Sequence, residues 1–534
     1  MTCPRRCAIL WVWWMGAGLA LAQQGAESCS GCHEQKLKSA HAPLACPACH
    51  PKHDAYPHPA ALAKPACASC HQPVAADYTR GVHGQAAAKG NAGAPDCALC
   101  HGSVHDAIKP REPAFRAGVV ETCAMCHSEV VEQYRSSVHG QAVAKGIPQA
   151  PLCTDCHGEH SIQPHTSSAS NVHPSRQRET CGRCHGDVRL ARKFGLPSDR
   201  VVSFDASFHG LAQKAGSQTV ASCASCHGIH NILPSSGAKS TIHARNLPAT
   251  CGRCHPGAGQ RFTLGPIHQW PGRAEPAPVH WVRIFYLWVI PGTIGLMLLH
   301  NAGDWARKLD RLRLRPAAST APAEPSREIR MHTAERVQHG LLVLSFLTLV
   351  WTGFALNYPD QWWARPLTVW ESAWPVRRWV HRGAAVAFVL AAMGHALSLA
   401  WSPRLREHWR TLLPRAADLG EAWRHLLYNL GFGAAPPRRA AHSYVEKAEY
   451  WAVVWGAAVM ALSGFMLWAN NLMLAWLPKI WLDVAAAVHF YEAVLATLAI
   501  VVWHFYFVIF DPDVYPMDTA WLTGRSVRKK EPHS

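Results

Sequence analysis

Eighteen of the chain's twenty cysteines belong to nine copies of one short motif, Cys-x-x-Cys-His, between residues 29 and 255. The two thiols of such a motif can add across the vinyl groups of one haem while the adjacent imidazole reaches its iron. The motifs therefore predict nine covalent c-type haems. The cysteines involved are Cys29, Cys32, Cys46, Cys49, Cys67, Cys70, Cys97, Cys100, Cys123, Cys126, Cys153, Cys156, Cys181, Cys184, Cys223, Cys226, Cys251 and Cys254.

The histidine that ends each motif is the expected proximal iron ligand. Zinc is the alternative, because cysteine pairs with this spacing also form tetrahedral thiolate sites. A histidine follows every pair, and only Cys3 and Cys7 lie outside the motifs, which favours haem. The proximal histidines are His33, His50, His71, His101, His127, His157, His185, His227 and His255.

Electron-transfer haems need a second axial ligand, usually another histidine. His83, His139 and His209 are the strongest candidates, since each precedes a glycine and stands 14 residues before the next motif cysteine. For the other candidates a solvated surface histidine is the alternative. These are His41, His53, His58, His105, His160, His173, His230, His243 and His268, so that twelve candidates compete for nine places.

The fixed spacings show an internal repeat of haem pairs. His173 and His243 stand eight residues before Cys181 and Cys251, whereas Phe115 holds the equivalent place before the fifth motif. Haems packed this densely must supply most of the apolar filling themselves. We therefore expect a mainly α fold, with an irregular, haem-packed c-type domain of short helices and no useful strand pattern, followed by a transmembrane bundle.

The N-terminus indicates export. Residues 1–22 carry Arg5 and Arg6, an apolar run and small residues placed for cleavage, as in a secretory signal peptide, although an uncleaved anchor is the alternative. Composition changes near residue 272. We expect a signal peptide at 1–22, a periplasmic nonahaem cytochrome c domain at 23–272 and a membrane domain at 273–534.

Five apolar stretches in the membrane domain are long enough to cross a bilayer as helices. They lie near 281–300, 337–356, 379–401, 449–468 and 484–510. The loops expected inside the cell, with the tail, hold 19 Lys and Arg against four in the outer loops, which satisfies the positive-inside rule. We expect an inner-membrane, multi-pass protein with a cytoplasmic C-terminus. The net charge of +17 is therefore no sign of nucleic-acid binding.

Histidines within these spans predict two further haems, of the non-covalent b type. His489 and His504 lie fifteen residues apart on the last span, about 22 Å along a helix. His381 matches His489 in depth, and either His339 or His395 matches His504. An interhelical hydrogen bond is the alternative role for each of them.

The segment from Ala334 to His339, together with His381-Arg and the pair His489 and His504, resembles the dihaem cytochrome b subunits of membrane formate dehydrogenases and hydrogenases. This resemblance implies that His381 pairs with His489 and His339 with His504. The first span and His395 are additions to the pattern, so that the inner pairing stays open.

As a whole the chain resembles the Cbc-type inner-membrane cytochromes, which fuse a cytochrome c3/c7-like multihaem domain to a b561-like domain. The segments 444–451, 491–493, 513–516 and 521–524 carry this resemblance. It implies quinol:cytochrome c oxidoreductase activity, with the quinone pool and soluble periplasmic cytochromes c as partners. The oligomeric state stays open.

Acidic residues near the membrane haems could accept the quinol protons. Glu492 is the one acidic side chain well inside a span, and Glu446 and Glu449 lie at the inner edge of the fourth. For Glu492 a structural hydrogen bond is the alternative. Rival functions are quinone reduction in the reverse direction, reduction of a small nitrogen or sulfur oxyanion at an open haem, and haem storage.

Overall fold

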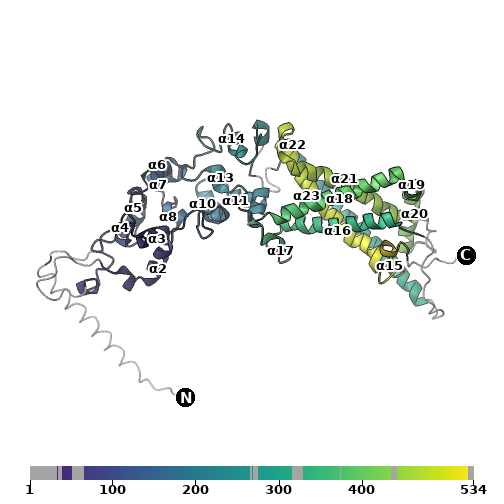
Figure 1. Ribbon diagram of the computed structural model, residues 1–534, viewed down its shortest axis with the longest axis horizontal. Helices are drawn as coiled ribbons and strands as arrows, with labels where there is room; N and C mark the ends of the chain where they lie inside the picture. Colours follow the sequence, from purple (N-terminus) through teal and green to yellow (C-terminus); the bar gives the residue numbers. More distant parts are fainter. Residues whose placement is uncertain are drawn as a thin grey trace, which may run out of the picture. The chain divides into compact units, whose positions relative to one another are not determined.

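The computed structural model describes residues 33, 39–50, 65–264, 267–268, 275–314, 329–372, 374–433 and 442–526. The chain forms two compact units. The first unit comprises residues 1–198 and 221–243, and the second comprises 199–220 and 244–534. The fold is mainly helical, as the sequence predicts (Figure 1). Over the described residues no strand occurs, and residues 329 and 525 form one isolated bridge.

Short helices make up the first unit, most of them beginning or ending at a Cys-x-x-Cys-His motif. They are η1 (Cys46–Ala48), η2 (Cys67–Ser69), α2 (Gln72–Arg80), α3 (Val82–Ala88), α4 (Cys97–His101), α5 (Pro113–Ala124), α6 (Ser128–Ser136), α7 (Val138–Ala144), α8 (Cys153–His157), η3 (Pro174–Arg176), α9 (Gln177–His185), α10 (Val188–Lys193) and α13 (Cys223–His227).

A pair of short helices recurs three times, as α2 with α3, α6 with α7, and, in the second unit, α11 (Arg200–Ala206) with α12 (Phe208–Lys214). The second helix of each pair carries the predicted His-Gly dipeptide. A Cβ on Gly84, Gly140 or Gly210 would lie 2.0–2.2 Å from the carbonyl oxygen six residues upstream. Only glycine fits there, because the two helices meet backbone to backbone.

Protein side chains alone give the first unit a small core. Its one cluster of buried hydrophobic residues consists of Val120, Val131 and Leu152, among the residues described there. Large apolar side chains such as Ile229 and Met125 are mostly exposed in the polypeptide. A chain of this length normally buries more apolar surface than that. A small polypeptide core is what we expect of a domain whose interior is filled by cofactors.

Five long helices dominate the second unit, and each contains one predicted span. They are α15 (Ala277–Leu314), α16 (Thr333–Asn357), α18 (Val376–Trp401), α21 (Tyr444–Trp468) and α23 (Lys479–Ala499), which continues through the π-helical turns η5 (Ile500–His504) and η6 (Tyr506–Phe510). With mean hydropathies of 1.6–2.3 over their most apolar windows, all five are long and apolar enough to cross a membrane.

The long helices form two hairpins with one additional helix. Helix α16 packs on α18 and α21 packs on α23, while α15 packs on α23 and on the shorter α20 (Ala416–Asn429). Other short elements lie between them, α17 (Arg365–Thr368), α19 (Pro403–Arg410) and α22 (Asn470–Trp476), and α24 (Ala520–Thr523) follows the last long helix. The hairpins bring the interior faces of four long helices together.

The second unit also contains the last Cys-x-x-Cys-His motif. Residues 244–264, with α14 (Leu247–Gly252) and η4 (Gln260–Thr263), belong to it together with α11 and α12. The compact unit therefore begins upstream of residue 272, where the composition changes. As a result, the motif histidine His255 and the His209-Gly210 dipeptide belong to the same unit as the five long helices.

Candidate functional site

Among the described residues of the first unit, six ring contacts each join a motif histidine to a candidate second ligand. The centres of the paired rings lie 6.0–6.3 Å apart. The pairs are His71 with His41, His50 with His105, His127 with His83, His101 with His160, His185 with His139, and His157 with His230.

This separation fits two imidazoles on opposite sides of one metal ion. A metal–nitrogen bond of about 2 Å on each side places the ring centres about 6 Å apart. Neutral imidazole is the ligating form. Burial, and after it the facing His185 ring, lowers the pKa of His139 to about 4, so that this side chain is neutral near pH 7. The residues present therefore fit bis-histidine iron ligation.

The second unit holds a seventh pair of this kind, His209 with His255, at 6.2 Å between ring centres. His255 Nδ1 lies 3.1 Å from the side-chain oxygen of Asn471 on α22. Six residues after His255, Arg261 donates from Nη1 to the carbonyl oxygen of Trp476, at 3.2 Å. Two contacts thus join the last motif to the loop region between α21 and α23.

Other predicted ligands have different surroundings. Cys29, Cys32, His53 and His58 lie outside the described residues. His173 is buried, with Nδ1 2.7 Å from Ser175 Oγ. His243 repeats the local backbone geometry of His173, since the N–H of each donates to the carbonyl oxygen of the serine three residues earlier, at 3.1 Å. His268 Nδ1 lies 3.0 Å from Ser203 Oγ.

Two more histidine pairs lie between the long helices. His381 of α18 faces His489 of α23 at 6.4 Å between ring centres, and His339 of α16 faces His504 at 6.3 Å. These distances match those of the seven pairs above. Because His489 and His504 lie fifteen residues apart in the chain, the pairs occupy two depths of the bundle. We call His381 with His489 the outer pair, and His339 with His504 the inner pair.

Hydroxyl groups orient the outer pair. Thr352 Oγ1 lies 2.8 Å from His381 Nδ1, and Ser463 Oγ lies 2.9 Å from His489 Nδ1. Each hydroxyl donates its proton to the carbonyl oxygen four residues earlier in its own helix, so that its oxygen accepts from the imidazole. Both rings then carry their proton on Nδ1 and leave Nε2 free to bind iron.

A glycine follows each of these hydroxyl residues and lies against the same ring. A Cβ on Gly353 would be 3.5 Å from His381 Cε1, and one on Gly464 would be 3.1 Å from His489 Cε1. The sequences around them repeat, as Thr-Gly-Phe-Ala-Leu at 352–356 and Ser-Gly-Phe-Met-Leu at 463–467. The histidine spacings do not reveal these hydroxyl and glycine residues. The internal repeat between 352–356 and 463–467 is the sequence signal that could have revealed them.

A carboxylate orients one member of the inner pair. Glu449 Oε2 lies 3.2 Å from His504 Nδ1, while Glu449 Oε1 is buried without a partner. His504 itself ends a π-helical turn, a distortion often found at functional sites. The structure brings His339, and not His395, to His504.

Both ring nitrogens of His395 have other partners. Its Nδ1 lies 3.1 Å from Gln338 Oε1 and its Nε2 lies 2.9 Å from the Tyr450 hydroxyl. The two contacts join α18 to α16 and to α21. A hydrogen-bonded role between helices is therefore the one that the geometry supports for this histidine.

The other two acidic candidates also have partners. Glu492 is buried, and its Oε2 accepts from the hydroxyl of Tyr286 on α15 at 2.8 Å. Glu446 pairs with Arg330 and accepts from the backbone N–H of Ser443, which caps α21. Of the three candidates, Glu449 is the one in contact with a histidine of the two bundle pairs.

Comparison with known proteins supports the reading of the bundle. Residues 330–516 match the family model of prokaryotic cytochrome b561. This match includes all four histidines of the outer and inner pairs and leaves α15 outside. No curated protein and no solved structure matched the chain. The five apolar helices indicate a multi-pass membrane protein, and the b561 similarity indicates a role in electron transfer.

Proposed function

We propose that the chain is a membrane-bound quinol dehydrogenase, which passes electrons through two b-type haems and nine c-type haems to soluble cytochromes of the periplasm. The observation that carries this proposal is the set of facing imidazoles, seven at the motifs and two between the long helices, all with ring centres 6.0–6.4 Å apart in the part of the chain described.

Each pair would supply both axial ligands of one haem. The motif cysteines would hold the c-type haems, and the outer and inner pairs would hold the b-type haems without a covalent bond. When bound, such haems supply one-electron transfer. The protein's own contribution is to fix ring orientation, for the outer pair through Thr352 and Ser463 and for the inner pair through Glu449.

The order of the c-type centres follows the order of the chain. Within the first unit three pairs of consecutive motifs bring cysteine side chains close together, Cys67 to Cys97, Cys123 to Cys153, and Cys181 to Cys223. These three pairs of motifs, adjacent in sequence, are thus adjacent in space. Electrons would pass from motif to motif in sequence order, and a linear path of this kind suits conduction over distance better than catalysis at one open haem.

The last motif is the junction in this proposal. His255 and His209 belong to the same compact unit as the long helices, and His255 contacts Asn471 beside the end of α21 that is nearer the outer pair. An electron leaving the outer pair would therefore reach the haem at Cys251 and Cys254 first. The remaining c-type haems would carry it onward.

Orientation follows from the loops. With the positive-inside rule, the first unit and the outer pair face the periplasm, and the inner pair and the C-terminus face the cytoplasm. A reporter enzyme fused after Ser534 should show the activity expected of a cytoplasmic location. One fused after Gly272 should show the activity expected of a periplasmic location. An opposite result at either site would contradict the arrangement of spans.

Haem analysis tests the cofactors. Pyridine haemochrome spectra of the purified full-length protein should give nine c and two b haems. Fewer than eight c haems, or zinc in place of iron, would contradict the assignment of the motifs.

Electron flow tests the function. Quinol analogue added to membranes should reduce the c haems. His489→Ala should keep all nine c haems, which are covalent, and lose one b haem, so that quinol no longer reduces the c haems although dithionite still does. Reduction by quinol at near the parent rate would overturn the proposed path through the outer pair.

A further inference from the structure

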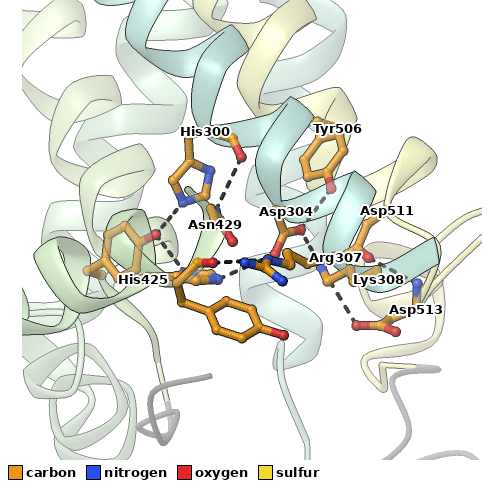
Figure 2. A network of polar contacts seen from close by, with 11 residues as sticks. His300, Asp304, Arg307, Lys308, His425, Asn429, Tyr506, Asp511 and Asp513 are labelled. Carbon is orange, nitrogen blue, oxygen red and sulfur yellow. Dashed lines mark hydrogen bonds and ion pairs between the residues drawn. The ribbon is translucent and has the colours of Figure 1, made fainter. Parts of the chain in front are cut away.

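A buried polar network surrounds the C-terminal half of α15, the long helix outside the b561 match (Figure 2). It joins α15 to α20, to the start of α21 and to the segment that follows α23. Its members are His300, Asn301, Asp304 and Lys308 of α15, His425 and Asn429 of α20, Tyr444 of α21, and Tyr506, Asp511 and Asp513.

One end of the network is ionic. The fully buried Lys308 has its Nζ 2.6 Å from Asp304 Oδ2 and 2.8 Å from Asp511 Oδ2. Asp513 Oδ2 lies 3.6 Å from the same nitrogen, and its side chain is 38% exposed. Asp513 therefore connects the buried charges to solvent, on the side of the bundle where the inner pair lies.

The middle of the network is a chain of groups that both donate and accept protons. His425 Nε2 lies 3.4 Å from Asp304 Oδ1, and His425 Nδ1 lies 2.9 Å from the Tyr444 hydroxyl. The same hydroxyl lies 2.5 Å from His300 Nε2. One hydroxyl thus stands between two imidazoles, an arrangement in which a proton can enter on one side as another leaves on the other.

The other end of the network holds three buried polar atoms that make no well-aligned hydrogen bond, and the Asn301 side chain lies beside the His300 ring. The three atoms are His300 Nδ1, Asn301 Oδ1 and Asn429 Oδ1, on residues that are 7%, 7% and 9% exposed. Buried polar atoms are rarely left unpaired unless a water or ligand meets them. The His300 ring lies 4.9 Å from the ring of Trp503, the residue before His504 of the inner pair.

An ion cluster that only fastened α15 would need Lys308 and its carboxylates. It would not need a tyrosine between two imidazoles, or a buried imidazole nitrogen beyond them that makes no well-aligned hydrogen bond. Burying charges is costly even when they are paired. The network instead links a solvent-exposed carboxylate, through the 3.6 Å ion pair of Asp513 with Lys308, to a buried nitrogen near the inner pair. Its geometry is that of a path for protons.

We propose that this network is a proton relay between the cytoplasmic surface and a quinone headgroup beside the inner pair, a proposal that rests on the quinol dehydrogenase function. Quinol gives up two electrons to the b-type haems and two protons. For each proton, the quinol O–H bond breaks as an N–H bond forms at His300 Nδ1. Protons then shift from His300 to Tyr444, from Tyr444 to His425 and from His425 to Asp304. Lys308 gives one of its protons to Asp513 and takes one from Asp304 in its place, and Asp513 releases its proton to solvent.

Removing one hydroxyl tests the relay. Tyr444→Phe keeps the ring but breaks the chain between the two imidazoles. Tyr428→Phe is the matched control, because Tyr428 lies on α20 beside His425, contacts Arg307 through its ring and its carbonyl oxygen, and lies outside the proton path. Stopped-flow spectra of the full-length protein in detergent would follow b-haem reduction by a water-soluble menaquinol analogue, in H₂O and in D₂O.

For Tyr444→Phe we expect both b haems, complete reduction by dithionite, and quinol-driven reduction at least tenfold slower than in the parent. Tyr428→Phe should stay within twofold of the parent. His300→Gln is a second relay variant, since an amide can hydrogen-bond Tyr444 but cannot pass a proton through itself; it should be as slow as Tyr444→Phe. In the parent, D₂O should slow quinol-driven reduction but not dithionite reduction.

Three results would overturn the relay. The first is a parental rate in either relay variant, and the second is an equal loss in Tyr428→Phe. The third is loss of a b haem in both relay variants, which would make the network structural. Failure of the proposed function looks different, because quinol would then fail to reduce the b haems of the parent protein itself.

Discussion

The hydroxyls of Thr352 and Ser463 perform for the outer pair the orienting role that carboxylates often perform for metal-bound histidines. Thr352→Val keeps the size of the side chain but removes the acceptor for His381 Nδ1. We expect outer b-haem affinity to fall by about tenfold to a hundredfold, measured by haem retention during dilution. Thr348→Val is the control, because the Thr348 hydroxyl lies on the same helix and donates to the Leu344 carbonyl oxygen rather than contacting a histidine. Equal retention in both variants would contradict the role of Thr352.

The two glycines beside the outer pair should differ in their tolerance of a methyl group. A Cβ at Gly353 would make an ordinary 3.5 Å contact, whereas one at Gly464 would lie 3.1 Å from the His489 ring. Gly464→Ala should therefore shift the ring and alter the low-temperature EPR signal of one b haem, while Gly353→Ala should leave it close to the parent. A larger change in Gly353→Ala would show that the rings are not held as described.

Histidine spacing made most of the facing imidazole pairs predictable, whereas the hydroxyls that contact them were not predictable. His83, His139 and His209 could be identified because a fixed distance to the next motif accompanies a glycine that the backbone requires. Thr352 and Ser463 could not be identified as readily, since a hydroxyl in a long apolar helix commonly bonds its own backbone. Here each hydroxyl bonds its backbone and a histidine from the next helix at the same time.

Helices α16 and α18 each carry one candidate partner for His504, the proposed ligand of the inner b haem. His339→Ala should remove one b haem and leave the outer one, because His504 faces His339. His395→Ala should keep both b haems and lower only thermal stability, by an amount typical of interhelical hydrogen bonds in membranes, about 0.6 kcal/mol. Difference spectra of the two purified variants give the answer. Loss of a b haem in His395→Ala would reverse the assignment.

The connection between α19 and α21 should depend on pH. Burial above all lowers the pKa of His442 to about 4, and its Nδ1 lies 2.7 Å from Thr411 Oγ1. The unfolded chain, with an ordinary histidine pKa of about 6.5, binds this proton more readily. The stabilising contribution is therefore complete above about pH 6.5 and declines as the pH falls toward 4.

Thermal unfolding in detergent at pH 7.5 and pH 5 would measure the contribution of His442. The parent should lose more stability between these values than His442→Gln, whose side chain does not titrate. An equal loss in both proteins would mean that other histidines account for the whole pH dependence.

The two units should depend differently on their cofactors. The first unit has one small cluster of buried hydrophobic residues in its described part, whereas the second has long helices that fold as apolar spans. Expression in cells unable to attach c-type haem should therefore leave the first unit open to proteolysis and the b-type spectrum intact in the membrane. A protease-resistant first unit without haem would contradict the expectation that haem fills it.

Sequence patterns predicted the helices of the membrane half, but they did not predict which residues outside it group with these helices in one compact unit. Apolar runs revealed the five spans, because a bilayer demands length and hydrophobicity from one continuous segment. The grouping of residues 199–220 and 244–264 with the membrane helices depends on particular contacts, such as His255 with Asn471 and Arg261 with the Trp476 carbonyl. Such contacts leave no periodic signal in the sequence.

The two depths of the histidine pairs make the proposed reaction sensitive to transmembrane voltage. His489 and His504 are fifteen residues apart, about 22 Å along a helix, which is most of a hydrocarbon layer of about 30 Å. With protons leaving through Asp513 and electrons leaving at the outer pair, every electron carries its charge across the field alone. Moving one elementary charge across the whole membrane changes the free energy by about 2.3 kcal/mol for each 100 mV of membrane potential. An inside-negative potential would accelerate quinol oxidation and be dissipated by it, whereas quinone reduction by the same route would build that potential.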